Sequence, residues 1–363
     1  MRIQGEASRT IWLNDDGWSV STFDQRLFPH RIELVRLTDV NEAARAIKDM
    51  VVRGAPLIGA TAAYGFALAL RDDPSDAGVR DAYLRLVETR PTAVNLKWAL
   101  DEVQTAVMSH VPHNRAEAAY ARAAEIVEDD VAVCARIGEN GLSIIKRLSE
   151  AKGGAPVNIL THCNAGWLAC IDWGTATAPV YMAHAAGIQV HVYVDETRPR
   201  NQGGALTAFE LGQEGVPHTV IVDNAGGHLM QAGEIDMCIV GTDRTAANGD
   251  VANKIGTYLK ALAACDNNVP FYVALPHTTI DWELERGHDI PIEERSAREV
   301  THVSGLTSAG QVQEVQVVAS GSPAANPAFD VTPARLVTAL ITDRGICPAT
   351  REGLLSLFPE RHS

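Results

Sequence analysis

The hydrophobic pattern of the chain changes about midway along its length. Residues 1–35 contain short stretches in which apolar and polar positions alternate, which predicts a small antiparallel sheet. Residues 39–152 instead carry apolar positions at helical spacing, and the stretch 115–148 predicts one long helix. The glycine-containing residues 153–156 then separate this part from a region with a different pattern.

The second half of the chain alternates short apolar runs with helical segments. Buried apolar runs that are each followed by a helix are typical of a parallel, doubly wound sheet. We therefore predict an α/β fold, with a small, mainly helical N-terminal domain and short antiparallel sheet over residues 1–150, and a Rossmann-like parallel-sheet domain over residues 151–363. The segments expected to be helices between strands are 177–187, 204–215 and 251–266. The runs expected to be strands are "VNILTH" (157–162), "IQVHVYVD" (188–195), "HTVIVDN" (218–224), "MCIVGTD" (237–243) and "FYVALP" (271–276).

Four of the predicted strands end in polar loops. Ligands of an open parallel sheet bind outside the carboxyl ends of its strands, so we expect these loops to converge on one site. No G-x-G-x-x-G turn follows the first strand and the chain has no G-x-x-x-x-G-K-[ST] loop, which disfavours a dinucleotide cofactor and a P-loop nucleotide site. The four loops are "THCNAG" (161–166), "DETRPRNQGG" (195–204), "DNAGGH" (223–228) and "GTDRTAANGDVANK" (241–254).

Two of these loops carry residues suited to catalysis. Cys163 lies at the end of the first strand beside His162 and Asn164, where a thiol would face the ligand edge of the sheet; a small buried hydrophobe is the alternative interpretation. Asp243, in the loop after the fourth strand, is a candidate acid, and a cap of the following helix is its alternative role. We expect His162 to orient its neighbours through hydrogen bonds rather than to act as a base.

A second group of residues suits an anionic ligand. Arg53 precedes Gly54, and the segment from Ala55 onward predicts a helix, whose N-terminus is a favourable anion site. Arg90 and, from the other domain, Lys254 add positive charge. These residues predict a phosphate clamp between the domains, and surface ion pairs are the alternative for Arg53 and Arg90.

Composition restricts the binding partners and the cellular compartment that we expect for the protein. The chain has 31 basic and 45 acidic residues, a formal net charge of −14, which disfavours a nucleic-acid surface. The N-terminus has no apolar signal segment, and the apolar stretch 55–70 is too short to span a membrane, so we expect neither secretion nor membrane attachment. The six cysteines form no C-x-x-C pair, which disfavours a zinc or disulfide framework and favours reduced thiols in the cytoplasm.

Several long segments also match a known family. They are "FDQRLFPH", "MVVRGAPLIG", "RPTAVNLKWA", "THCNAG", "DETRPRNQG", "GTDRTAANGDVANKIGTY", "IPIEER" and "NPAFDVTPARLVTALIT". Through them the chain resembles, almost end to end, the methylthioribose-1-phosphate isomerases of methionine salvage. That family is related to the regulatory subunits of the eukaryotic initiation-factor-two exchange factor, which share the fold but lack the cysteine motif. The presence of Cys163 therefore favours an enzyme.

The resemblance implies a cofactor-independent, metal-free isomerisation of 5-methylthioribose 1-phosphate to 5-methylthioribulose 1-phosphate by a homodimer. It implies that Asp243 protonates the ring oxygen, because C1 phosphorylation blocks ordinary ring opening, and that Cys163 acts either as a base or as a stabiliser of charge. It leaves open whether the C2 hydrogen moves as a proton or as a hydride. Besides the catalytic pair, it assigns substrate contacts to Arg53, Gly54, Ala55, Arg90, Gln202, Asn253 and Lys254.

The segment after the cysteine motif departs from the expected run of small residues. It contains Trp167, Cys170, Asp172 and Trp173, whose rings either reshape the pocket or fill the core. The substituent at C5 of the substrate is therefore open, and 5-deoxyribose 1-phosphate or ribose 1,5-bisphosphate would undergo the same C1–C2 chemistry. A non-catalytic regulatory subunit of the same fold is the alternative from another functional class.

Overall fold

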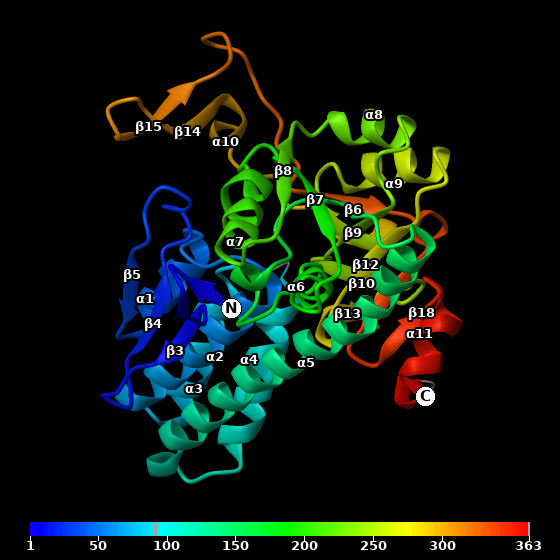
Figure 1. The fold of residues 1–363 in the computed structure, drawn as a ribbon. Coiled ribbons are helices and arrows are strands. Elements are labelled where there is room, and N and C mark those ends of the chain that lie inside the picture. Colours follow the sequence, from blue (N-terminus) through cyan, green and yellow to red (C-terminus); the bar gives the residue numbers. More distant parts are fainter. Residues whose placement is uncertain (91–92, 362–363) are drawn as a thin grey trace.

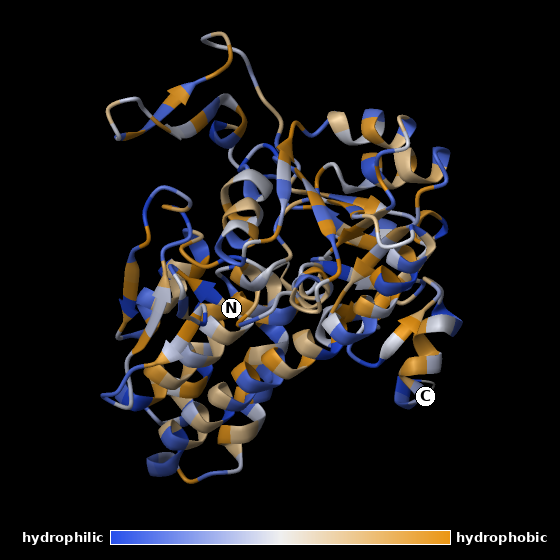
Figure 2. Cartoon of the chain, viewed as in Figure 1, coloured by the Kyte–Doolittle hydropathy of each residue, from blue (hydrophilic) through white to orange (hydrophobic). Residues whose placement is uncertain are grey.

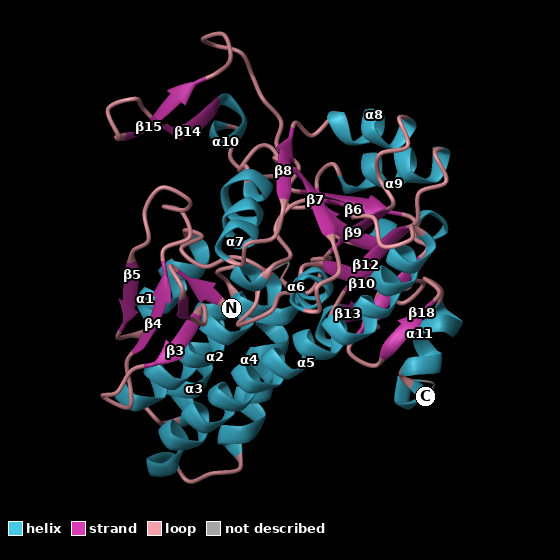
Figure 3. Cartoon of the chain, in the orientation of Figure 1, coloured by secondary structure: helices cyan, strands magenta, loops and turns pink. Residues whose placement is uncertain are grey.

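The computed structural model describes residues 1–90 and 93–361 (Figure 1). Its N-terminal part is mainly helical, and its C-terminal part surrounds a mostly parallel sheet (Figure 3). The predicted fold class is therefore confirmed. The N-terminal elements are β1 (Arg2–Ile3), β2 (Glu6–Ala7), β3 (Ile11–Leu13), β4 (Val20–Phe23), β5 (Leu34–Leu37), α1 (Val40–Lys48), α2 (Ala55–Asp72), α3 (Asp76–Val87), α4 (Val94–Met108) and α5 (Arg115–Ala151).

Helix α2 is the centre of the N-terminal part. It packs against α1, α3, α4 and α5, and 13 of its 18 residues are buried, most of them alanines, glycines and large apolar residues. Gly54, the residue before the helix, has a φ of +93°, and a Cβ at this position would lie 2.4 Å from the carbonyl oxygen of Ala169. A glycine is required there because the backbone is left-handed and the wall opposite is close.

The C-terminal part contains a seven-stranded sheet with the order β18-β17-β12-β9-β6-β7-β8. All neighbouring pairs are parallel except β17 with β18. The elements of this part are β6 (Val157–Thr161), α6 (Ala178–Ala185), β7 (Val190–Asp195), α7 (Ala208–Gln213), β8 (His218–Ile221), α8 (Ala225–Gln231), β9 (Met237–Val240), β10 (Arg244–Ala246), β11 (Val251–Lys254), α9 (Thr257–Asp266), β12 (Phe271–Ala274), β13 (Ile280–Asp281), α10 (Arg298–Thr301), β14 (His302–Leu306), β15 (Val312–Gln316), β16 (Phe329–Thr332), β17 (Ala339–Thr342), β18 (Gly345–Cys347) and α11 (Arg351–Leu357).

The sheet is covered on both faces, which explains its continuous apolar strands. Ile159 of β6 belongs to the core formed with α5 and α6, whereas the next residue, Leu160, belongs to the core formed with α8 and α9. Cys238 and Ile239 of β9 divide between the two cores in the same manner. Successive side chains of a strand point to opposite faces, so each face receives half of every apolar run.

Two local predictions differ from the structure. Residues 251–254, expected to begin a helix, form strand β11, which pairs with β10 on one side and β16 on the other; helix α9 begins only at Thr257. Residues 223–228, expected to be a loop, contain the start of α8. In the first case hydrogen bonding to β16, a strand distant in sequence, overrides local helical spacing.

Helix α5 connects the two parts of the molecule. It packs on α2 and α4 at one end and on α6 and β17 at the other (Figure 1). Our boundary at residue 150 lies one residue before the end of this helix, and the division into two domains remains a prediction. Within residues 1–90 and 93–361, no helix combines the length and the apolar character that crossing a bilayer requires.

One element projects from the body. The antiparallel hairpin β14–β15, preceded by α10, extends away from the sheet (Figure 1). Figure 2 shows hydrophobic residues along β15 in orange. Leu306 and Val315 are about half exposed, at 54% and 49%.

Candidate active site

All nine residues predicted for the site line one pocket between the N-terminus of α2 and the carboxyl ends of the parallel strands. Elements distant in sequence supply them, because parallel strands end at the same edge of a sheet. The loops after β6, β7 and β9, strand β11 and two N-terminal loops all contribute. The nine residues are Arg53, Gly54, Ala55, Arg90, Cys163, Gln202, Asp243, Asn253 and Lys254.

Cys163 is held in an unusual backbone conformation directly after β6. Its φ is +69°, a value that non-glycine residues adopt only when their surroundings fix it. The backbone N–H of Cys163 donates to Thr197 Oγ1 at 2.8 Å, and Thr207 Oγ1 donates to the carbonyl oxygen of Cys163 at 2.7 Å. The thiol donates to Gln202 Oε1 at 2.8 Å. These bonds direct a buried thiol to the pocket rather than to the core.

Burial in the pocket favours the neutral forms of the Cys163 thiol and the Asp243 carboxyl group, and the nearby cations oppose this effect. Burial raises the pKa of Cys163, while Arg53 and Lys254 partly oppose that effect. Burial also raises the pKa of Asp243, against the opposing influence of Lys254 and Arg90. Burial lowers the pKa of Lys254, and both Cys163 and Asp243 counteract this. A carboxyl group with a raised pKa holds its proton more firmly than a free one, which suits an acid that protonates an oxygen of a substrate.

The cationic residues are arranged around the N-terminus of α2. Arg53 donates through Nη1 to Asn164 Oδ1 and through Nη2 to the carbonyl oxygen of Asn164, at 2.8 Å in the second case. Arg90 Nη2 lies 3.0 Å from Glu293 Oε2. Lys254 Nζ donates to the carbonyl oxygen of Ala328 at 3.0 Å. Three cations beside a helix N-terminus make a site suited to a phosphate group.

The buried carboxyl group of Glu210 holds the loop after β6 in place. Glu210 accepts hydrogen bonds from Asn164 Nδ2 at 3.0 Å, from the backbone N–H of Leu168 at 2.7 Å and from the Tyr181 hydroxyl at 3.0 Å. Burial raises the pKa of Glu210 to about 7. A Cβ at Gly166 would overlap the Glu210 carboxyl group, so the glycine of "THCNAG" makes room for it. Sequence reasoning missed Glu210 because it lies inside an ordinary helical segment.

His162 takes part in a second buried network. Its Nδ1 lies 2.8 Å from Asp195 Oδ2 and its Nε2 lies 2.8 Å from the carbonyl oxygen of Ile255. Lys260 Nζ approaches the same Asp195 oxygen at 3.2 Å. Because both ring nitrogens are engaged, this histidine orients the strand ends, in the role that we expected for it.

The third loop has a different role from the one predicted. It supplies none of the pocket-lining residues; instead, the Asp223 carboxylate accepts hydrogen bonds from the backbone N–H groups of Thr197 and Arg198, both at 2.7 Å. The loop therefore holds the second loop in place, and Thr197 in turn accepts the N–H of Cys163.

Other pocket residues were not singled out from the sequence. Arg295 lines the pocket and lies in the segment "IPIEER", which carried the resemblance without receiving a role. Trp167 is fully buried in the core shared with α5 and α6, and Trp173 packs partly buried against that core. Neither ring lines this pocket, so of the two interpretations of these rings the structure favours core filling.

The chain was compared with known proteins. A model of the initiation factor 2 subunit family matches residues 51–349. A methylthioribose-1-phosphate isomerase from Methylocella silvestris is 62% identical over 363 residues, which cover 99% of each protein. The crystal structure of 5-methylthioribose 1-phosphate isomerase from Pyrococcus horikoshii OT3 matches with a TM-score of 0.84 and 40% identity, over 98% of this chain and 97% of that one. The crystal structure of the translation initiation factor eIF-2B, subunit delta, from A. fulgidus matches with a TM-score of 0.79 and 36% identity, over 97% of this chain and 100% of that one. These matches confirm the resemblance, and the chain belongs to the initiation factor 2 subunit family, within the group that contains the methylthioribose-1-phosphate isomerases.

Proposed function

We propose that the protein is an aldose–ketose isomerase that converts 5-methylthioribose 1-phosphate to 5-methylthioribulose 1-phosphate. One observation carries the proposal: Cys163 and Asp243, from the ends of different strands, line one pocket together with Arg53, Arg90 and Lys254. The names of the relatives supply the substrate.

The pocket suits the chemistry in three steps. The cations and the N-terminus of α2 bind the C1 phosphate. Asp243, kept neutral by burial, donates its proton to the ring oxygen, and the C1–O bond to the ring breaks. The C2 hydrogen then moves to C1 while the C2 hydroxyl loses its proton to form the ketone, so that one carbon is oxidised and its neighbour reduced with no external redox agent.

The state of Cys163 bears on how the C2 hydrogen moves. A thiol with a raised pKa that donates to Gln202 holds its proton more firmly than a free thiol, which supports direct hydride transfer over abstraction of a proton by Cys163. In that route the neutral Cys163 lies beside the carbons where positive charge develops. Proton abstraction through a cis-enolate would require loss of the thiol proton first.

The lining of the pocket supports an uncharged group at C5. Met50, Pro56, Ala169 and Cys170 contribute apolar surface. The additional cation, Arg295, is already engaged, because its Nη2 lies 2.7 Å from Glu299 Oε1 and its Nη1 lies 3.3 Å from Glu293 Oε1. A second phosphate would therefore lack a free counter-charge from Arg295, which favours a methylthio or deoxy substituent over ribose 1,5-bisphosphate.

An isomerase assay with three substrates tests the proposal. We expect turnover of the methylthioribose 1-phosphate, less of 5-deoxyribose 1-phosphate and least of ribose 1,5-bisphosphate. With substrate deuterated at C2, we expect the label to appear at C1 without loss to water. Washout of the label would establish the enolate route. Absence of turnover on all three substrates would refute the isomerase assignment and favour a regulatory subunit.

We further propose that the protein works in the cytoplasm as a homodimer that binds neither nucleic acid nor membrane. The net charge of −14 and the reduced state of all six cysteines support this assignment. Apolar residues exposed on the hairpin β14–β15 offer a surface for subunit association. Light scattering should give twice the chain mass, and Leu306→Ser combined with Val315→Ser should weaken the dimer. A monomer at micromolar concentration would contradict the proposal.

A further inference from the structure

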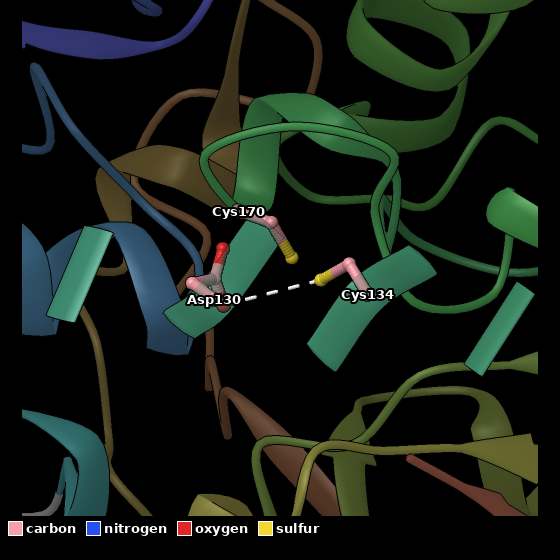
Figure 4. A group of neighbouring side chains, drawn as sticks. All are labelled: Asp130, Cys134 and Cys170. Atoms are coloured by element: carbon pink, nitrogen blue, oxygen red, sulfur yellow. Dashed lines mark hydrogen bonds between the residues drawn. The ribbon is translucent and has the colours of Figure 1, made fainter. Parts of the chain in front are cut away.

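Three side chains with metal-ligating atoms meet beside the active-site pocket, which one of them, Cys170, also lines. Figure 4 shows the three side chains together. Asp130 and Cys134 are four residues apart on α5 and therefore share one face of the helix. Cys170 follows the 3₁₀ turn Trp167–Ala169. The two sulfur atoms and a carboxylate oxygen all lie within 4.8 Å of one another. We propose that Asp130, Cys134 and Cys170 form a binding site for a thiophilic divalent cation of the zinc class.

The three groups are held in position by hydrogen bonds that leave their ligand atoms available. The backbone N–H of Ile171 donates to Asp130 Oδ2 at 2.9 Å, so Oδ1 faces Cys134 Sγ at 3.9 Å. Thr10 Oγ1 donates to the carbonyl oxygen of Cys170 at 2.5 Å, and the backbone N–H of Thr10 donates to Ile171 O at 3.2 Å. Such outer bonds fix the orientation of metal ligands.

The donor set selects the class of ion. Two thiolates and one carboxylate match the preferences of zinc, whereas magnesium and calcium prefer oxygen ligands throughout. Three protein ligands leave a fourth tetrahedral position, which water can fill. Asp130 also lines a neighbouring pocket of about 240 Å³ and Cys170 lines the active-site pocket, so an ion can approach from either side.

The thiols must lose their protons when an ion binds. Burial raises the pKa of Asp130 to about 7, and the hydrogen bond with Cys170, followed by burial, raises the pKa of Cys134. Proton release couples metal affinity to pH, and affinity should rise as the pH rises.

A second cluster in the described chain, His162 with Asp195 and Asp223, has comparable spacing but does not carry the same inference. Lys260 Nζ lies 3.2 Å from Asp195 Oδ2 and also donates to the carbonyl oxygen of Asp223, so a positive charge already occupies the position of an ion. No cation is among the groups that shift the pKa of Asp130 or Cys134, whereas Arg53 acts on the pKa of Cys170.

Ion binding would connect α5 to the loop that forms one wall of the pocket. Ala169, next to Cys170, lies against Gly54 at the N-terminus of α2. The proposed ion is structural, since neither Cys163 nor Asp243 is among its ligands. Binding should stabilise the folded protein by mass action, because the unfolded chain does not bring the three ligands together.

Cobalt and zinc titrations test the proposal. Protein purified with a phosphine reductant and dialysed against a chelator should take up one Co²⁺ with an intense sulfur-to-cobalt charge-transfer band, and one Zn²⁺ should displace it and raise the melting temperature. Cys134→Ser and Cys170→Ser should each weaken binding by at least about tenfold and remove most of the band. Asp130→Asn should weaken binding while both thiols remain.

Two matched controls separate this site from the other thiols. Cys163→Ser, in the active site, and Cys265→Ser, on the exposed surface, should both keep the full band. Circular dichroism checks that every variant is folded. Failure of the reduced protein to bind, or a band that persists in Cys134→Ser, would overturn the proposal. So would a Cys134–Cys170 disulfide in unreduced protein whose reduced form takes up no ion, which would identify a redox pair instead.

Discussion

Two thiol-containing regions lie next to one pocket, and their surroundings differ in charge. Cys163 at the end of β6 and the pair Cys134 and Cys170 are all buried, and burial contributes to a raised pKa in each. Arg53 and Lys254 act on Cys163 from across its pocket. The pair lies beside the carboxyl group of Asp130; Arg53 also acts on Cys170, whereas the charged groups that act on Cys134 include Asp130 and Asp172.

The difference teaches that burial alone does not decide what a cysteine does. Cations beside Cys163 make negative charge on sulfur or on a bound phosphate tolerable, which suits catalysis. A carboxylate beside two thiols makes additional negative charge unfavourable unless a cation joins it, which suits metal binding. Matched substitutions in the two regions test this contrast.

The largest expected effect separates the two buried aspartates. Asp243→Asn should lower kcat by roughly 10²–10⁴-fold with little change in KM, because a general acid is lost. Asp130→Asn makes the same chemical change in the cluster of Asp130, Cys134 and Cys170 and should keep kcat within a few-fold. Steady-state kinetics on the sugar phosphate measures both. Equal losses would mean that the Asp243 carboxyl group acts through structure rather than through proton donation.

The corresponding cysteine substitutions should also lower kcat more strongly in the active site than in the Asp130 cluster. Cys163→Ser should reduce kcat by about 10²-fold or more, since a hydroxyl is a harder and less polarizable group beside the reacting carbons. Cys134→Ser should leave kcat nearly unchanged in metal-free buffer. A similar kcat for both variants would remove the distinction between the two thiol regions.

The influence of the cations on Cys163 can be measured directly. Lys254→Gln should move the pH profile of Cys163 alkylation upward by about one pH unit, because the positive charge that stabilises the thiolate is removed. The experiment uses a Cys265→Ser background to remove the exposed thiol, and mass spectrometry identifies the labelled residue. Lys97→Gln, an exposed substitution on α4, should leave the profile in place. An unchanged profile for Lys254→Gln would show that this cation does not act on the thiol.

The smallest expected effect concerns stability and pH. The folded pKa of Asp130, about 7, exceeds its unfolded value of 3.8, so the protonated carboxyl group contributes stability that is fully present below pH 3.8 and is lost as the pH rises through 7. The contribution is at most about 4 kcal/mol and smaller in practice, since water reaches part of the side chain.

Asp130→Asn does not titrate and should therefore gain stability relative to the unmodified protein as the pH rises from 5 to 8. Urea unfolding at several pH values in chelator measures this difference. Asp129→Asn, on the exposed neighbouring residue, should show a much smaller trend. A pH-independent difference between Asp130→Asn and the unmodified protein would argue that Asp130 ionises as freely in the folded state as in the unfolded chain.

Much of the fold was predictable because its signals are local. The apolar runs at β6, β7, β9 and β12 and the long helix α5 follow directly from the periodicity of the sequence. Strand β11 was not predictable in this way, because residues 251–254 are held by pairing with β16 from much later in the chain. Among the residues of the site, Glu210 and Arg295 carried no local signal, since an acidic residue in a helix and an arginine in a loop are usually solvated.

The sequence by itself determined which residues end the parallel strands, and parallel geometry requires such ends to meet at one edge. That is why Cys163 and Asp243 could be predicted to lie together, whereas Lys254 reaches the pocket from β11, a strand of a separate four-stranded sheet. Only the tertiary structure decided the charge around each thiol, because Arg53 reaches the pocket from the N-terminal part. It alone brought together Cys134 and Cys170, which are 36 positions apart (170 − 134) in a sequence whose spacing disfavours a metal site. Side-chain proximity across packed helices and loops depends on the whole core, and no local pattern encodes it.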